Sequence, residues 1–432
     1  MRAFLLLAAL LVAARPDPLA VATVMPVQPT KTIALSFDDA PRGPGAFLTV
    51  DQRNAKLIAA LREASVEQAA FFINPGRIMP GDGHEQRIGR YVAAGHVIAN
   101  HTFLHAHLSA MSAAAFVGQI DGADDWLKGR PGFRPWFRFP ALDEGGANKA
   151  KRDAVRAGLK ARGLSNGYAS VDGSDWFIEG ETIAAKKAGK PIDMAALRDL
   201  YVETMVQSAN FSDDLMRRTL GRAVPQMLLL HETDIAALFV ADLVAALRKD
   251  GWTIITADRA FADPAYRAQP DIAYANGTLA EQLAWAHKLP GQRWFDRNDR
   301  KVATALFADR VLHAGGGTEA LPDGAALARA AALPHIPVPL RGCWQSPDAR
   351  ARLTLGYATI EIAGSPKRYA MADSVSRVAA RRIDGNFLLP TPTGRRTLAR
   401  TLSLGPDAFG TPPGRLRMTG GGAGDRAFVR CS

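Results

Sequence analysis

Short apolar segments alternate with segments of helical periodicity over the first two thirds of the sequence. The expected strands are residues 33–37, 68–73, 96–99, 136–139, 168–171, 227–230 and 252–256, and the expected helices between them are residues 55–64, 85–94, 113–127, 149–161, 194–220 and 236–249. Strands that alternate with helices of this length are typical of parallel βα units. The pattern therefore predicts an α/β fold, either a barrel or a doubly wound sheet.

The pattern changes twice after residue 262. Two further helical segments are expected at residues 279–286 and 301–312, and we assign residues 263–333 to a helical extension of the first domain. The proline-rich residues 334–340 have the composition of a linker.

Residues 341–432 contain short β-rich runs punctuated by Gly, Pro and Asp, as in an antiparallel sandwich or a small barrel. The run that begins with Gly342-Cys343-Trp344 resembles the Gly-x-Trp that opens lipocalin-like barrels, although the pattern is short. We therefore expect a small all-β domain at the C-terminus.

The N-terminus has the features of a secretory signal peptide, which we place at residues 1–22. Arg2 is followed by an apolar run over residues 3–14, and small residues suited to cleavage follow, at the latest at Ala22. A membrane anchor is the alternative, but a bilayer span needs about 20 apolar residues. We therefore expect a secreted protein and place it in the periplasm.

Composition agrees with a folded protein of two or three domains and shows where its charge lies. The chain has 432 residues, of which 47% are hydrophobic and 22% charged, and its formal net charge is +11. Residues 336–432 hold 15 Lys and Arg against 6 Asp and Glu. This excess favours an anionic partner for the C-terminal domain, such as an acidic glycan or an envelope surface, although a merely solvated basic surface is an equal alternative. We do not expect a nucleic acid as a partner.

The two cysteines, Cys343 and Cys431, bracket the C-terminal domain. In an oxidising compartment they could form a disulfide bond that closes a long loop and stabilises the fold by about 4 kcal/mol. Two free thiols are the alternative.

Two of the expected strands are followed by residues that suit a metal ion. Asp38 and Asp39 come directly after the first strand, and adjacent carboxylates are costly unless a cation or a proton separates their charges. His101 and His105 are four residues apart, so they would share one face of a helical turn and could bind one ion. One Asp and two His leave a coordination position open for water, as in catalytic sites.

Three more polar elements follow expected strands. They are Arg138-Phe139-Pro140, the run Asp172-Gly173-Ser174-Asp175-Trp176, and Leu229-Leu230-His231. Each of them alone has an ordinary structural explanation. Catalytic groups in parallel α/β folds gather at the carboxyl ends of the strands, and all five elements are expected at that edge.

In this order and context the five elements resemble the polysaccharide deacetylase family, also described as the NodB-homology domain or carbohydrate esterase family four. The resemblance covers residues 30–262 and implies a distorted (β/α) barrel. It implies that Asp39, His101 and His105 bind a divalent metal ion, commonly zinc in this family.

The resemblance also implies the remaining roles. Asp38 would be the general base, oriented by Arg138, and His231 the general acid, held by Asp175. The groove for the substrate would be lined by Phe139, Pro140, Ala141, Trp176 and Leu229, with the backbone N–H of Ala141 stabilising the oxyanion.

Four features depart from the family pattern. Ala40-Pro41 replaces the usual Gly after the Asp pair, and Ala141 replaces an aromatic residue. Asp143-Glu144 adds acidic charge close to the site, which could narrow the choice of substrate or serve a local role. Residues 177–225 form an insertion that we expect to be helical and to cover one side of the site.

The sequence thus predicts a metal-dependent hydrolase that removes N-acetyl groups from an amino-sugar polymer or oligosaccharide, such as peptidoglycan, chitin oligosaccharide or an exopolysaccharide. An O-acetyl glycan esterase and a small-amide hydrolase are alternatives that would use the same residues. A third alternative is an inactive carbohydrate-binding envelope protein.

Overall fold

A parallel sheet lies at the centre of the first domain in the computed structural model, which describes residues 31–314 and, from residue 340 to residue 430, eight strands and a few residues beside them. The strands of the sheet are β1 (Lys31–Ala40), β2 (Ala70–Ile73), β3 (Val97–Asn100), β4 (Phe133–Phe137), β6 (Ser165–Asn166), β7 (Val171–Asp172), β8 (Gln226–His231) and β9 (Trp252–Ile254). Their order is β6-β4-β3-β2-β1-β8-β7, and β9 also pairs with β1. Since no pairing joins β6 to β7 among the described strands, this is a distorted, open barrel, as expected.

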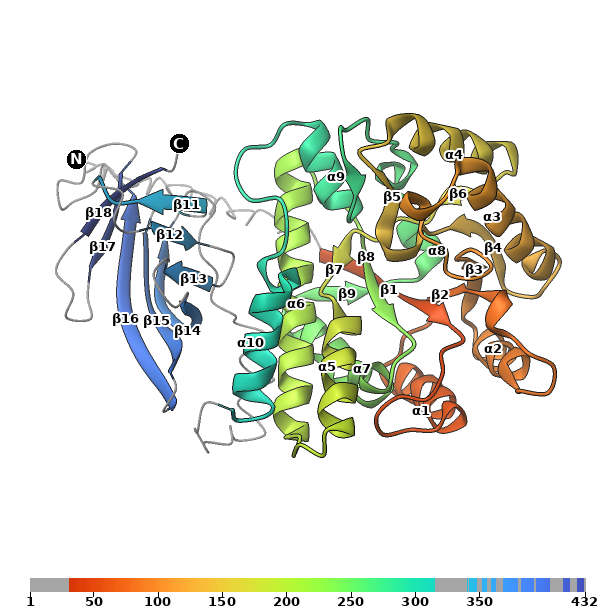
Figure 1. Cartoon of the computed structure of the whole chain (residues 1–432), viewed down its shortest axis with the longest axis horizontal. Coiled ribbons are helices and arrows are strands. Elements are labelled where there is room, and N and C mark those ends of the chain that lie inside the picture. The colour runs from red at the N-terminus through yellow and green to blue at the C-terminus, as the bar shows by residue number, and fades with distance from the viewer. Residues whose placement is uncertain are drawn as a thin grey trace, which may run out of the picture.

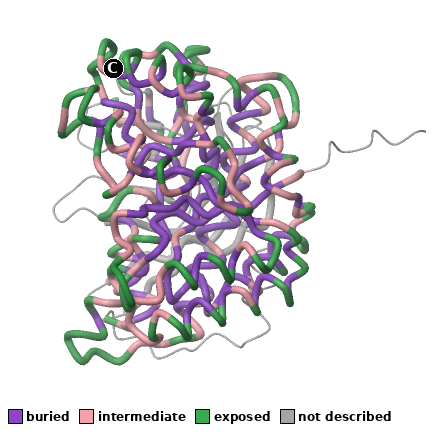
Figure 2. The backbone as a smooth tube through the Cα atoms, turned by 90° about the vertical axis from the view of Figure 1, so that its right-hand side faces the viewer, coloured by how far each residue is buried: buried purple, intermediate pink, exposed green. Residues whose placement is uncertain are grey.

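Helices surround this sheet (Figure 1). They are α1 (Val50–Glu63), α2 (His84–Ala93), α3 (Ala113–Leu127), α4 (Lys149–Ala161), α5 (Asp175–Lys187), α6 (Met194–Leu220), α7 (Asp234–Lys249), α8 (Ala257–Phe261), α9 (Leu279–Ala286) and α10 (Arg300–Arg310). Local sequence sets many of their starts, because Thr49, Ser112, Asp193 and Thr233 each accept a hydrogen bond from the first turn. The buried residues lie on the strands and on the helix faces turned toward them (Figure 2).

Most expected elements agree with the structure, and the differences lie at their ends. α3, α4, α6 and α9 have the expected bounds, whereas α1 starts five residues earlier, at its Thr49–Gln52 capping box. The strand expected at residues 168–171 is reduced to Val171–Asp172. The insertion at residues 177–225 is helical and consists mainly of α5 and α6.

A short two-stranded sheet ties the helical extension to the first domain. β10 (Ala275–Asn276) pairs with β5 (Asp143–Gly146), and neither strand was expected from the sequence. Residues 315–339, which include the end of the expected extension and most of the expected linker, lie outside the described residues. None of the helices in the described ranges is long and apolar enough to span a membrane.

The C-terminal strands form a closed antiparallel barrel, which confirms the expected small all-β domain. They are β11 (Gly342–Gln345), β12 (Arg352–Leu355), β13 (Thr359–Ile362), β14 (Arg368–Ala379), β15 (Arg382–Thr391), β16 (Gly394–Leu404), β17 (Leu416–Thr419) and β18 (Arg426–Arg430). Each strand pairs with the next, and β18 pairs with β11. Trp344 is buried and donates a hydrogen bond to the backbone carbonyl of Leu340.

Candidate metal centre and active site

An irregularity at the end of β1 brings Asp38 and Asp39 to the same place. In a regular strand, adjacent side chains point to opposite faces of the sheet. Here β1 advances three residues, from Phe37 to Ala40, while its partner β2 advances only two, so β1 contains one extra residue. Asp39 takes up this residue with a φ of 68°, in the left-handed region that non-glycine residues rarely adopt. Both carboxylates consequently approach one imidazole nitrogen, Nε2 of His101, at 3.7 and 3.5 Å.

The two histidines meet without the helical turn expected from their spacing. Residues 101–105 form an irregular loop after β3, and Thr102 and His105 both have positive φ angles. Asn74 holds this loop by donating hydrogen bonds to the backbone carbonyls of His101 and Thr102. The helical expectation was wrong because contacts with a neighbouring strand end, and not the local spacing, set this backbone.

Asp39, His101 and His105 form a cluster that suits a metal ion. Their potential ligand atoms lie within 4.8 Å of one another. Oδ1 of Asp39 is buried without a well-aligned hydrogen bond and lies 2.8 Å from Nε2 of His105. Nδ1 of His101 is 2.9 Å from the carbonyl oxygen of Arg138, to which it can donate a hydrogen bond. In that tautomer Nε2 carries no proton, so its lone pair can bind a metal ion.

The charge states in this cluster also suit a cation. Burial opposes ionisation of Asp39, but the imidazoles of His101 and His105 beside it hold the pKa of its carboxyl well below its usual range. Burial lowers the pKa of the His105 imidazole, which favours its neutral form. One carboxylate and two imidazoles form the donor set of a catalytic zinc-type site, and the residues present fit such an ion.

Arg138 fixes the second carboxylate. Its Nη1 donates to Oδ1 of Asp38 at 2.6 Å and to the hydroxyl of Ser36, and its Nε donates to the carbonyl of Gly167. The guanidinium also lies over the ring of Phe72, 3.9 Å from its centroid. These contacts with two strands and a loop fix Arg138 and leave Asp38 little freedom, as a positioned acid–base group requires.

His231 and Asp175 form a second buried pair beside the carboxylates. The register of β1 against β8 places His231 opposite Asp38, and Asp175 is the first residue of α5. Asp175 accepts from Nδ1 of His231 at 2.7 Å and from its backbone N–H at 2.8 Å. Burial alone would lower the pKa of His231, but the charge and hydrogen bond of Asp175 raise it to about 9. The imidazole is therefore a cation at neutral pH.

The residues expected to line the substrate groove differ in how far they are exposed to solvent. Phe139, Pro140 and Leu229 are buried, whereas Ala141 and Trp176 reach the surface. Ala141 has a φ of 54°, a strained conformation of the kind that gathers at functional sites.

Asp143 and Glu144 do not present acidic charge to the site. Both are almost fully buried, Asp143 accepts hydrogen bonds from Ser109, and Glu144 forms an ion pair with Arg156. Of the two expected roles, the structure supports a local one and not an influence on substrate choice, because both carboxylates are paired inside the protein.

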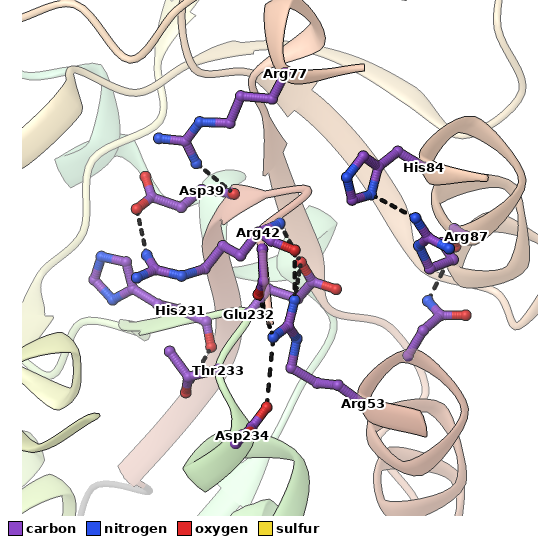
Figure 3. A network of polar contacts seen from close by, with 12 residues as sticks. Asp39, Arg42, Arg53, Arg77, His84, Arg87, His231, Glu232, Thr233 and Asp234 are labelled. Carbon is purple, nitrogen blue, oxygen red and sulfur yellow. Dashed lines mark hydrogen bonds and ion pairs between the residues drawn. The ribbon is translucent and has the colours of Figure 1, made fainter. Parts of the chain in front are cut away.

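Several residues near the site carried no recognisable signal in the sequence. Asn74 follows β2, Glu232 follows His231 directly, and Arg42 and Arg77 both donate to Asp39. Figure 3 shows the two arginines and His231 around Asp39. Only Arg42 could have been noticed, because it lies three residues after the Asp pair.

The His231–Asp175 pair predicts a pH dependence. Since the folded-state pKa of His231, about 9, lies above the ~6.5 of an unfolded histidine, the pair stabilises the fold fully below about pH 6.5. This stabilisation, on the order of 3 kcal/mol, is lost as the pH rises through about 9. NMR titration of the metal-free protein should find that pKa, and Asp175→Asn should lower it by a unit or more. Asp82→Asn, beside His84, is the control; an unchanged His231 pKa in Asp175→Asn would contradict the assignment.

Comparison with known proteins agrees with this geometry. A sequence model described as polysaccharide deacetylase matches residues 26–161, which include the Asp pair, both histidines and Arg138. The comparison with curated protein sequences gives no match.

Solved structures with a related fold include a deacetylase with substrate, "T48 deacetylase" (23% identical, TM-score 0.34, covering 54% of this chain and 92% of that chain). They also include the chitin deacetylase of the fungal pathogen Colletotrichum lindemuthianum (18%, 0.38, 54% and 89%) and a CE4 family pseudoenzyme of Bacillus anthracis (14%, 0.37, 54% and 65%). These likenesses are too distant to decide the chemistry. Residues 26–161 thus match the polysaccharide deacetylase family, and the structure brings all five sequence elements to one edge of the sheet.

Proposed function

We propose that this protein is a metal-dependent deacetylase that removes N-acetyl groups from an amino-sugar polymer or oligosaccharide. The observation that carries the proposal is the arrangement of a base and an acid on adjacent strands. Asp38 and His231 are register partners, and each is held by an oppositely charged residue beside the three-residue metal cluster. Hydrolysis of an amide requires a proton acceptor for water and a proton donor for the amine, and both are present.

The proposed metal is zinc, held by Asp39, His101 and His105. A zinc ion there would polarise the acetyl carbonyl and lower the pKa of a water molecule. The ordering of His101 by the carbonyl of Arg138 supports the assignment, because ligand histidines are commonly fixed through their second nitrogen.

The protein's own residues supply the proton transfers. Asp38 accepts a proton from the water as the water oxygen attacks the carbonyl carbon, and the ion pair with Arg138 orients the Asp38 carboxylate for that step. As the C–N bond breaks, the His231 imidazolium donates its proton to the departing amine. Acetate and a free sugar amine are the products.

The groove assignments extend the same proposal. The backbone N–H of Ala141 would donate to the developing oxyanion, which the exposed position of this strained residue supports. Trp176, with 39% of its surface exposed, would contact the sugar, and Phe139, Pro140 and Leu229 would form the apolar floor.

The alternatives use the same residues. An O-acetyl glycan esterase would need the same base and metal, but its alcohol product needs less help from an acid. A small-amide hydrolase would need no extended groove. An inactive carbohydrate-binding envelope protein would have no reason to keep the acid, the base and the metal cluster together, so catalysis is favoured.

We also propose export and an envelope role for the C-terminal barrel. The expected signal peptide (residues 1–22) and Cys431 lie outside the described residues. Export and the disulfide bond are therefore proposed mainly from the sequence. The pairing of Trp344 with Arg430, the residue before Cys431, supports a Cys343–Cys431 bond.

The 15 Lys and Arg in residues 336–432 support binding of the C-terminal domain to an acidic glycan. The test is retention of the protein on an acidic but not on a neutral polysaccharide at low salt.

The metal assignment predicts one divalent ion per chain. Elemental analysis of protein purified without chelators should find it, and His101→Ala should lose it because one of three ligands is removed. His107→Ala, an exposed neighbour of His105 outside the cluster, should keep it. Full occupancy in His101→Ala would show that the ligands are wrong.

The catalytic assignment predicts that Asp38→Asn and His231→Ala each lower acetate release by at least about 100-fold, the scale of a positioned acid or base. Release should be measured on acetylated chitin oligosaccharides, peptidoglycan and O-acetylated xylan, with metal content checked in each variant. A fully loaded wild-type protein that releases no acetate from any of them would refute the proposed function.

The export assignment predicts an N-terminus near residue 23 and an oxidised cysteine pair in protein recovered from the periplasm. Mass spectrometry without reductant should find the peptides of Cys343 and Cys431 linked. Free thiols at both positions in periplasmic protein would contradict the bond.

A further inference from the structure

Arg42 is a charged residue at the site that the catalytic roles do not use. Its Nη1 donates to Oδ2 of Asp39 at 2.5 Å, whereas the cluster with the histidines uses Oδ1 of the same carboxylate. Within the described part of the chain, this is the only hydrogen bond that the Arg42 guanidinium makes. The Arg42 side chain is 29% exposed, so part of it reaches the solvent.

The backbone around Arg42 is fastened to the turn between β8 and α7. Its backbone N–H donates to Oε2 of Glu232 at 2.9 Å, and the buried Arg53 donates to its carbonyl at 2.7 Å. Further along the same loop, the N–H groups of Phe47 and Leu48 donate to Asp234. The guanidinium is thus held beside the site by a fixed loop, and Figure 3 shows it between Asp39 and His231.

Arg77 adds a second positive charge beside Arg42. Arg77 donates to the backbone carbonyl of Asp39 at 2.9 Å, so a second guanidinium lies close to the first. Burial lowers the pKa of Arg77, and the charge of Arg42 adds to that effect while Asp39 opposes it.

We propose that Arg42 is a specificity-determining residue that binds a carboxylate carried by the glycan, on the acetylated sugar or on the sugar next to it. A guanidinium has five N–H donors, so an arginine that donates one hydrogen bond to Asp39 has others left. Two of them in one plane can bind both oxygens of a carboxylate. The inference rests on the proposed function and adds a substrate class to it: acetylated glycans that contain an acidic sugar.

The test compares two tetrasaccharides that carry the same N-acetylglucosamine. One is a hyaluronan tetrasaccharide, and the other is its carboxyl-reduced form, in which each uronate is a neutral glucose. Wild-type enzyme should show the higher kcat/KM on the acidic form. In Arg42→Gln the ratio of the two values should fall about tenfold, the scale of one charge-assisted hydrogen bond, and Arg42→Lys should keep part of it.

Arg248→Gln is the matched control, because this exposed arginine ends α7 at the opposite edge of the sheet and should keep the wild-type ratio. Using a ratio separates substrate recognition from a role in holding Asp39, since loss of metal affects both substrates equally. An unchanged ratio in Arg42→Gln, or no wild-type preference, would overturn the proposal.

Failure of the proposed function is recognised separately. If the wild-type protein releases no acetate from either tetrasaccharide, calorimetric titration of the full-length protein with both sugars still decides the inference. Tighter binding of the acidic form that Arg42→Gln abolishes would support it, and equal or absent binding of the two forms would refute it.

Discussion

Two like charges on adjacent residues, buried at the end of one strand, are the constraint on which the rest of the site depends. Asp38 and Asp39 are both more than nine-tenths buried, where carboxylates repel each other more strongly than in water. The protein answers with a cationic partner for each of them, Arg138 for Asp38 and Arg42 for Asp39. The oxygen of Asp39 that faces His105 keeps no well-aligned donor, which is where a metal ion would complete the balance.

The same need for compensation extends to the neighbouring strand. His231 lies opposite Asp38, and its charge is balanced in turn by Asp175, the first residue of α5. The next residues of the chain, Glu232 and Asp234, fasten the loop that carries Arg42. His231, Asp38 and Arg42 are therefore all positioned by contacts with the end of β8 and the turn that follows it. A change in this turn is expected to affect all three.

The two proposals about acidic ligands rest on independent observations. The C-terminal domain carries its excess of Lys and Arg as a matter of composition, whereas Arg42 is placed by specific hydrogen bonds in the first domain. Both would suit a glycan with acidic sugars, the first by holding the polymer and the second by choosing the residue to be deacetylated. Because the experiments use different parts of the chain, one can fail without the other.

Periodicity was sufficient for the fold class, parallel βα units, because local rules dominate there, whereas the choice of a distorted barrel came from the family resemblance. The alternation of apolar strands with capped helices specifies parallel βα units, and helices such as α3, α4 and α6 have the bounds that periodicity predicts. The five polar elements could be placed at one edge of the sheet because parallel strands all end on the same side. The site residues named from the sequence lie there together, although their catalytic roles remain to be tested.

Only the tertiary structure decided how these residues meet. The extra residue in β1, the left-handed backbone of Asp39, Thr102 and Ala141, and the irregular loop that replaces a helical turn before His105 have no local signature, since none of them is a glycine position. Such conformations cost energy and persist only when contacts from distant segments impose them, as Asn74 does for the histidine loop. The sequence by itself thus determined which chemical groups come to this edge of the sheet, while the packing of remote segments decided which atoms face one another, including Arg42 against Asp39.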